Sequence, residues 1–551
     1  MKKMTLLPAV LAASAALLAV PARAQHDHAS HSRHDHGAPE KLGTVAFPNS
    51  CRPEVQAAFT RAMALLHSFG YEEARKAFLE VVRDDPRCGI SHWGIAMTYY
   101  HPIWAPPNAE ELAAGRAAAE NAGQVGAQTE RERAYIDAIG AYYSGADPRA
   151  RALAFHQAMG DMARRFPDDD EAAIFHALTL LATAPPSDTT FVKQKEAARI
   201  LNRLLPRHPD HPGIAHYVIH SFDYPELAED ALPAARAYAK IAPDSPHALH
   251  MPSHIFTRLG LWRESIASNI DSAEAGRRLV ARAHPGKASF DTLHALDYLE
   301  YAYLQVGDEA KARAALEETA RATTFDEPNF AAGYALVAIP ARWALERRDW
   351  KAAAALEPPG ATMPWAQYPH IPAITSFARA VGAARSGQLG RAREALAEIQ
   401  RIHAGLVKSE VAGPYDWTGN VESMRLAAAG MLAHADGGAE EAIRLLRSAA
   451  ELDEKTGKHP VTPGPVLPPR ELLADLLLEL DRPAEALAEY EAALRESPGR
   501  FNSVAGAAGA AERAGRGDRA AELYAQLLDM TVKGAERPEL AIARRFMATR
   551  K

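Results

Sequence analysis

The chain has 551 residues and a formal net charge of −7; 48% of its residues are hydrophobic and 24% are charged. This length exceeds what one globular core normally holds, so we expect several domains or a repeat array. The acidic balance excludes nucleic acid as the main partner, because neutralising phosphates requires a basic face.

The first 24 residues have the pattern of a signal peptide. Two lysines at positions 2 and 3 precede an apolar run from Leu6 to Val20, and Ala22-Arg23-Ala24 fits a signal-peptidase site. The run is too short to cross a bilayer, and no later stretch approaches the roughly 20 apolar residues that a crossing needs. We therefore expect a secreted chain without a transmembrane segment, periplasmic where the host has two membranes.

Residues 25–46 are predicted to be a disordered, histidine-rich linker, because their composition cannot build a core. The tract carries His26, His28, His31, His34 and His36. Such a tract suits weak, exchangeable capture of Zn²⁺ or Cu²⁺, and a plain polar spacer is the alternative interpretation. The chain has two cysteines, Cys51 and Cys88. In an oxidising compartment they predict one disulfide, with two separate buried thiols as the alternative.

Four stretches share one spacing. Each begins with an alanine, has an apolar or aromatic residue four and seven positions later, and has a proline twelve positions later. They are Ala74, Phe78, Val81, Pro86; Ala197, Leu201, Leu204, Pro209; Ala231, Ala235, Tyr238, Pro243; and Ala486, Tyr490, Ala493, Pro498. This spacing resembles the tetratricopeptide repeat, in which a small residue lets two helices approach and proline ends the second helix. The stretches "HMPSHIFTRLG" and "HWGIAM" are similar to segments of large exported bacterial proteins of this type.

Strand patterns are almost absent, and alanine-rich helical periodicity runs throughout the chain. The fold class is therefore predicted to be all-α, and the resemblance implies a right-handed α-solenoid of helix-turn-helix repeats. We divide it into an N-terminal array at 47–330 and a C-terminal array at 331–551. Proline-rich stretches such as "KHPVTPGPVLPP" are expected to be loops that close one end of a groove.

Two His-x-x-x-His pairs, His216 with His220 and His250 with His254, lie 34 residues apart, which is one repeat length. The resemblance places them on the first helices of two neighbouring repeats, facing the concave groove. Residues four apart share a helix face with Cβ atoms about 5–6 Å apart, and packed helices run about 8–10 Å apart. The pairs are therefore expected to form one imidazole patch.

Imidazole is a good ligand for zinc and copper, so the patch predicts a transition-metal site. We expect His216, His220, His250 and His254 as ligands of one or two ions, with His294 as a fifth ligand. Asp223 is expected to orient an imidazole through its second nitrogen. The predicted ligand-binding groove comprises His247, Asp223, Tyr217, Arg258 and Asp297.

The sequence thus predicts an exported solenoid acting as a binding protein, with a histidine-lined groove for zinc or copper and for a small ligand or peptide. Two alternatives stay open: a metal-independent scaffold with a protein or peptide partner, and a metal-dependent hydrolase with Asp223, Asp297 or Glu300 as proton acceptor. No nucleophile elbow, phosphate-binding glycine loop or His-Glu-x-x-His helix occurs. The residues do not decide whether the chain is an enzyme.

Overall fold

In the computed structural model the described residues are 40–104, 106–185, 188–409 and 415–550. The expected signal peptide and the five histidines of the tract lie outside them. Within the described residues, no helix is both long enough and apolar enough to span a membrane.

Lys41–Lys551 form one compact unit. The unit continues through position 330, where we placed a boundary between two arrays. It also includes residues 41–46, which the sequence assigned to the linker. Leu42 and Val45 are buried there, and the Thr44 amide donates to the Asp210 carbonyl at 2.9 Å. These two apolar side chains tie the end of the tract to the helical unit.

All regular structure in the described residues is helical, apart from one isolated bridge between Ala288 and Phe325. The helices up to residue 258 are α1 Gln56–His67, α2 Tyr71–Asp84, α3 Gly89–Met97, α4 Ala109–Val125, α5 Glu130–Ser144, α6 Pro148–Arg165, α7 Asp170–Ala182, α8 Val192–Leu204, α9 Pro212–Phe222, α10 Leu232–Ile241, α11 Pro246–His250 and α12 Pro252–Arg258. The later helices are α13 Trp262–Ala283, α14 Phe290–Gln305, α15 Glu309–Arg321, α16 Phe330–Glu346, α17 Trp350–Ala354, α18 Pro372–Arg385, α19 Leu389–Ser409, α20 Trp417–Ala435, α21 Ala439–Thr456, α22 Pro469–Glu479, α23 Pro483–Glu496, α24 Phe501–Arg513, α25 Gly517–Met530 and α26 Pro538–Thr549. Short 3₁₀ turns cover Pro53–Val55, Ala228–Ala231 and Trp365–Gln367.

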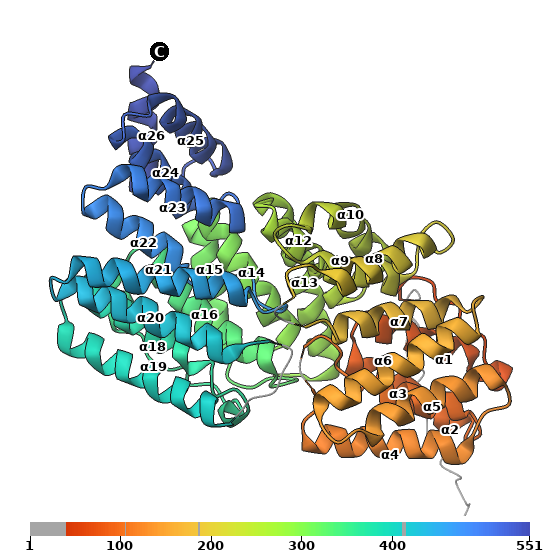
Figure 1. Cartoon of the computed structure of the whole chain (residues 1–551). Helices are drawn as coiled ribbons and strands as arrows, with labels where there is room; N and C mark the ends of the chain where they lie inside the picture. The colour runs from red at the N-terminus through yellow and green to blue at the C-terminus, as the bar shows by residue number, and fades with distance from the viewer. Residues whose placement is uncertain (1–39, 105, 186–187, 410–414, 551) are drawn as a thin grey trace, which may run out of the picture. The chain divides into compact units, whose positions relative to one another are not determined.

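The most extensive contacts join consecutive helices, as between α13 and α14 or α20 and α21 (Figure 1). The small and larger residues of the four repeat stretches are all buried at these seams: Ala74, Phe78, Val81, Ala197, Leu201, Leu204, Ala231, Ala235, Tyr238, Ala486, Tyr490 and Ala493. The chain is therefore an all-α solenoid of tetratricopeptide-like helix pairs, as the spacing predicts.

Two glycines show how closely these helices approach. A Cβ at Gly94 would stand 2.5 Å from the Phe78 ring, and one at Gly506 would stand 2.3 Å from the Tyr490 ring. Each glycine lies on the helix after the aromatic residue, at the same sequence distance from it. The aromatic side chain of the repeat thus packs directly on the backbone of the following helix.

Cys51 and Cys88 form a disulfide, which confirms the predicted pairing. It ties the segment before α1 to the residue before α3, across 37 residues of chain. Closing a loop of this length stabilises a fold by about 4 kcal/mol in the chain-entropy model.

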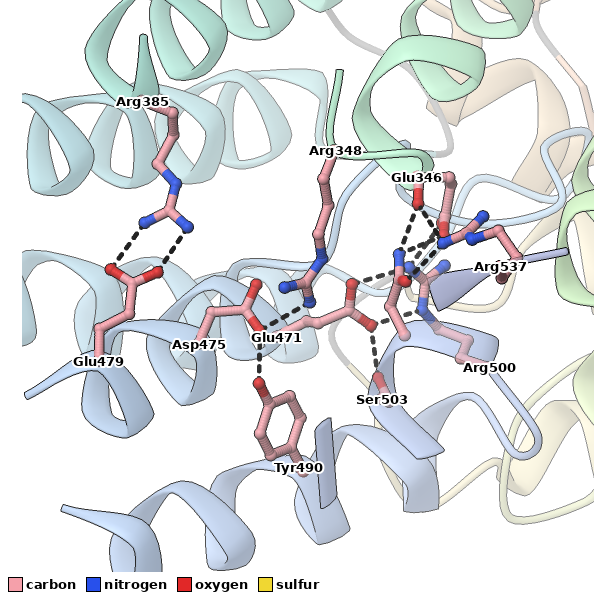
Figure 2. Close-up of polar contacts among 11 residues, drawn as sticks. Glu346, Arg348, Arg385, Glu471, Asp475, Glu479, Tyr490, Arg500, Ser503 and Arg537 are labelled. Atoms are coloured by element: carbon pink, nitrogen blue, oxygen red, sulfur yellow. Dashed lines mark hydrogen bonds and ion pairs between the residues drawn. The ribbon is translucent and has the colours of Figure 1, made fainter. Parts of the chain in front are cut away.

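The C-terminal half contains a buried polar network around Arg500, at the start of α24 (Figure 2). The Arg500 guanidinium donates to Glu346 at 2.6 Å, to Glu471 at 3.1 Å and to the Tyr301 hydroxyl at 3.0 Å. The Asn502 amide donates to the second oxygen of Glu346 at 3.0 Å. Each donor nitrogen of Arg500 therefore meets an acceptor.

The proline-rich segment 457–468, between α21 and α22, docks on helices far away in sequence. Lys458 Nζ lies 2.7 Å from Asp223 Oδ2. The Tyr298 hydroxyl donates to the Thr462 carbonyl at 3.0 Å, and the Tyr334 hydroxyl donates to the Gly464 carbonyl at 3.4 Å. This closing loop, as we call residues 457–468, covers the part of the molecule where the histidine pairs lie.

Candidate metal centre

Six histidines meet inside the solenoid as two triads, each with three ring nitrogens within 4.8 Å of one another. Triad 1 is His216, His220 and His247, and triad 2 is His250, His254 and His294. All five histidines that the sequence predicts as metal ligands belong to one of the two triads. His247, which the sequence placed in the groove, is the sixth member.

Proline placement sets the helices that carry these residues. Pro212 and Pro246 occupy the first turns of α9 and α11, where a missing amide hydrogen costs nothing. Pro252 ends α11 and begins α12, so His250 and His254 stand on two short consecutive helices. His294 comes from α14, whose first turn is capped by Ser289.

In triad 1, His216 Nε2 lies 3.1 Å from His220 Nε2 and 3.1 Å from His247 Nε2. The other nitrogen, His216 Nδ1, lies 2.7 Å from the backbone carbonyl oxygen of His67. Because a carbonyl only accepts, His216 Nδ1 carries the proton and Nε2 presents a lone pair. One lone pair can accept from one neighbouring N–H, whereas an ion at this point satisfies all three nitrogens.

In triad 2, the proton positions of two rings are fixed independently. His250 Nδ1 lies 2.6 Å from Asn269 Oδ1, and Asn269 Nδ2 already donates to the Ser265 carbonyl at 2.8 Å. His254 Nδ1 lies 3.0 Å from the Asp223 carboxylate. Both Nδ1 atoms therefore donate, and the two Nε2 atoms face each other at 3.0 Å, each with a lone pair. Two lone pairs at this separation repel unless a cation lies between them.

These spacings suit a shared ion. Imidazole nitrogens bind zinc at about 2.0–2.1 Å, so two of them on a tetrahedral ion stand about 3.3 Å apart. The observed separations of 3.0 to 3.1 Å are close to that value. The ligand atoms already converge as they would around metal.

The six rings are neutral at pH 7. Burial lowers the pKa of His216 to about 3. Burial also lowers the pKa well below the ordinary value at His220, His247, His250 and His294. At His254 burial lowers the pKa as well, although the Asp223 carboxylate opposes the shift. Neutral imidazole is the form that binds metal.

Asp223 anchors triad 2, as predicted. One of its oxygens accepts from His254 Nδ1 and from Lys458 Nζ, and the other accepts from Arg258 Nε at 2.9 Å. Although burial alone would raise it, Lys458 and Arg258 hold the pKa of Asp223 well below its usual range. A carboxylate on the outer nitrogen fixes the tautomer of a ligand histidine and raises its basicity.

The centre is enclosed, a point that the sequence left open. All six histidines are at most 7% exposed. Phe69 stacks on His220 and His247, and Trp104 packs edge-on against His247. Tyr298 stacks on His254 on the other side. The aromatic side chains and the closing loop together exclude bulk water.

Other predicted residues have their polar groups bound outside the triads. Asp297 and Glu300 both accept from Arg342, at 2.8 Å and 2.9 Å. The Tyr217 hydroxyl lies 3.0 Å from His67 Nδ1. Of the predicted groove residues, His247, Asp223 and Arg258 therefore belong to the centre, and Tyr217 and Asp297 are bound elsewhere.

Two further groups of potential ligands occur in the described residues. In one, Glu171 accepts from His67 Nε2 at 3.0 Å and from His211 Nε2 at 2.9 Å, so each contact pairs a donor with an acceptor. In the other, Cys51 and Cys88 lie beside Asp85 but are consumed by the disulfide. Each contact within the Glu171 group thus joins a donor to an acceptor, although His211 Nδ1 is buried without a hydrogen-bond partner among the described residues.

Sequence reasoning missed Lys458 and the membership of His247 in triad 1. The third ligands do not follow the repeat, because position 281, one repeat length after His247, is alanine. Lys458 reaches Asp223 across 235 residues of chain. Only the His-x-x-x-His pairs carry a local signal.

No family model matches the chain, and no curated protein matches it. Among solved structures it is similar to the human IFIT1 dimer with m7Gppp-AAAA, with a TM-score of 0.36, 12% identity and coverage of 80% of this chain and 90% of that one. It is also similar to yeast Tom70, with a TM-score of 0.28, 10% identity and coverage of 90% and 96%. At these values the likenesses are distant.

Proposed function

We propose that this chain is a metal-binding helical-repeat protein whose two histidine triads hold two transition-metal ions, zinc or copper. The observation that carries the proposal is the 3.0 Å approach of His250 Nε2 and His254 Nε2, both with their protons on the opposite nitrogen. A metal-independent scaffold gives no reason for burying two lone pairs against each other.

The hydrolase alternative receives less support. A metal-activated water needs a nearby base, and Asp223, Asp297 and Glu300 are each held by arginine or lysine. Burial raises the pKa of Glu300 to about 8, but Arg342 occupies one of its oxygens. The proposal therefore concerns binding and presentation of metal.

The proposed setting is outside the cytoplasm, where the signal-like first 24 residues would direct the chain. The Cys51–Cys88 disulfide supports an oxidising compartment. In that setting the histidine-rich tract would capture ions that the buried triads then hold.

Elemental analysis of protein purified without immobilised-metal resin tests the proposal. We expect about two ions per chain, retained when His26, His28, His31, His34 and His36 are all changed to serine. Changing His216, His220, His250 and His254 to alanine should remove both ions. A matched control with His403→Ala and His434→Ala, both remote from the triads, should keep them.

Circular dichroism and a thermal scan must show that each variant is folded. If the folded wild-type chain takes up neither zinc nor copper on titration, the proposal fails. The solenoid is then better tested against peptide and protein partners.

A further inference from the structure

The two triads are neighbours and share a helix. His247 of triad 1 and His250 of triad 2 both lie on α11, and their ring centroids are 6.3 Å apart. The rings of His220 and His254 also meet across the triads, at 6.2 Å. Ions held by the two triads would therefore face each other directly.

The charge around these ions is already positive. The six histidines are neutral, and the charged group that contacts one of them is Asp223, at His254. Lys458 and Arg258 both pair with Asp223. One carboxylate against two cations leaves no negative charge for the metals. Uncompensated buried charge is costly, so this shell disfavours two divalent ions.

Monovalent copper meets this constraint. Two Cu⁺ ions bring half the charge of two Zn²⁺ ions, and their mutual repulsion is about four times smaller at equal distance. Imidazole suits copper, and divalent copper outranks zinc at nitrogen donors, so oxidation would not release it. Three ligands per ion leave an open coordination position on each.

Resting on the proposed function, we infer that the six histidines form one dinuclear copper centre that binds dioxygen between its two ions. Each Cu⁺ gives one electron and becomes Cu²⁺. Dioxygen takes both electrons and becomes peroxide, its O–O bond falls from double to single, and new copper–oxygen bonds form on both ions. No proton moves, and release of dioxygen reverses every step.

The net charge of the centre does not change in this reaction. Two Cu⁺ carry the same total charge as two Cu²⁺ with one peroxide, so the buried shell need not reorganise. The enclosure by Phe69, Trp104 and Tyr298 keeps out water, which would protonate peroxide and release it. The exclusion of water and the unchanged net charge both favour reversible binding of dioxygen.

The test uses the full chain with the five tract histidines changed to serine, loaded with Cu⁺ under argon. We expect about two copper ions per chain and, after oxygen is admitted, a new near-ultraviolet absorption band that argon purging removes. The oxygenated protein should give no electron paramagnetic resonance signal, because two bridged Cu²⁺ ions couple their spins. His434→Gln, remote from the triads, is the matched control and should behave identically.

His294→Gln and His247→Gln each disable one triad. Either folded variant should keep about one copper, lose the oxygen band and give the resonance signal of an isolated Cu²⁺ after oxidation. Failure of the parent chain to bind any copper or zinc sinks the proposed function itself. Two bound coppers that give two independent Cu²⁺ signals, or displacement of Cu⁺ by equimolar Zn²⁺, overturn the dioxygen centre and leave metal binding standing.

Discussion

The Arg500 network and the histidine centre both bury many polar groups, but they balance them differently. Around Arg500 every guanidinium nitrogen meets an oxygen, so the protein alone satisfies the site. Figure 2 shows the contacts with Glu346 and Glu471. In triad 2 two acceptor nitrogens face each other at 3.0 Å. The two regions share burial, and the facing acceptors of triad 2 are what distinguish the candidate metal site from the Arg500 network.

The largest expected effect is metal removal. Two sites that bind only the folded chain each stabilise it by about 4 kcal/mol when free metal is 1,000 times the dissociation constant. A chelator should therefore lower the midpoint of thermal unfolding strongly in the wild type. The four-alanine triad variant should show no such shift, and an equal shift there would erase the contrast between the two regions.

The next largest effect is expected on the stability of the Arg500 network. Arg500→Ala leaves Glu346 and Glu471 buried without their cation, which should cost about 3–5 kcal/mol of unfolding free energy. Urea denaturation should report the same loss with and without chelator. Arg519→Ala breaks exposed ion pairs and serves as control, with an expected loss below about 1 kcal/mol.

A smaller effect is expected at Asp223. Asp223→Asn keeps the size of the side chain but removes the charge behind His254, so metal affinity should fall about 10–100-fold. Competition with a chromophoric chelator measures this. Asp297→Asn, beside Arg342, should leave the affinity unchanged. Equal losses in both variants would mean that Asp223 acts only through the fold.

The smallest effect on metal is expected at Glu171. Glu171→Gln disturbs a group in which His67 and His211 both donate to the carboxylate, and it should cost about 1–3 kcal/mol of stability. Metal content should not change. Loss of a bound ion in this variant would show that the Glu171 group contributes to metal binding. It would also show that the pairing of donors with acceptors does not identify metal sites.

The sequence predicts the fold well because its signal is local. Ala74, Phe78 and Val81 recur at a fixed spacing, and their copies pack at the seams. The disulfide and the two His-x-x-x-His pairs are readable for the same reason. Each depends on residues close in sequence or on residue type alone.

The enclosure of the centre could not be read in this way. Phe69, Trp104 and Lys458 reach it from distant segments, and no spacing links them to the histidines. The place of His247 in triad 1 depends on how α11 packs against α9. The proton positions of His216 and His250 were also hidden, since they are set by the His67 carbonyl and by Asn269.

The closing loop bears on when an ion could enter the centre and how long it would stay. All six ligands lie before residue 295, whereas Lys458 and Thr462 reach Asp223 and Tyr298 across 235 and 164 residues of chain. We expect such long-range contacts to form late in folding, so that an ion bound by the triads would enter while the histidines are still open to solvent. Once the loop has docked, the ion would leave only when the loop opens. We therefore expect its residence time to depend more on the opening of this proline-rich segment than on the strength of the nitrogen ligands.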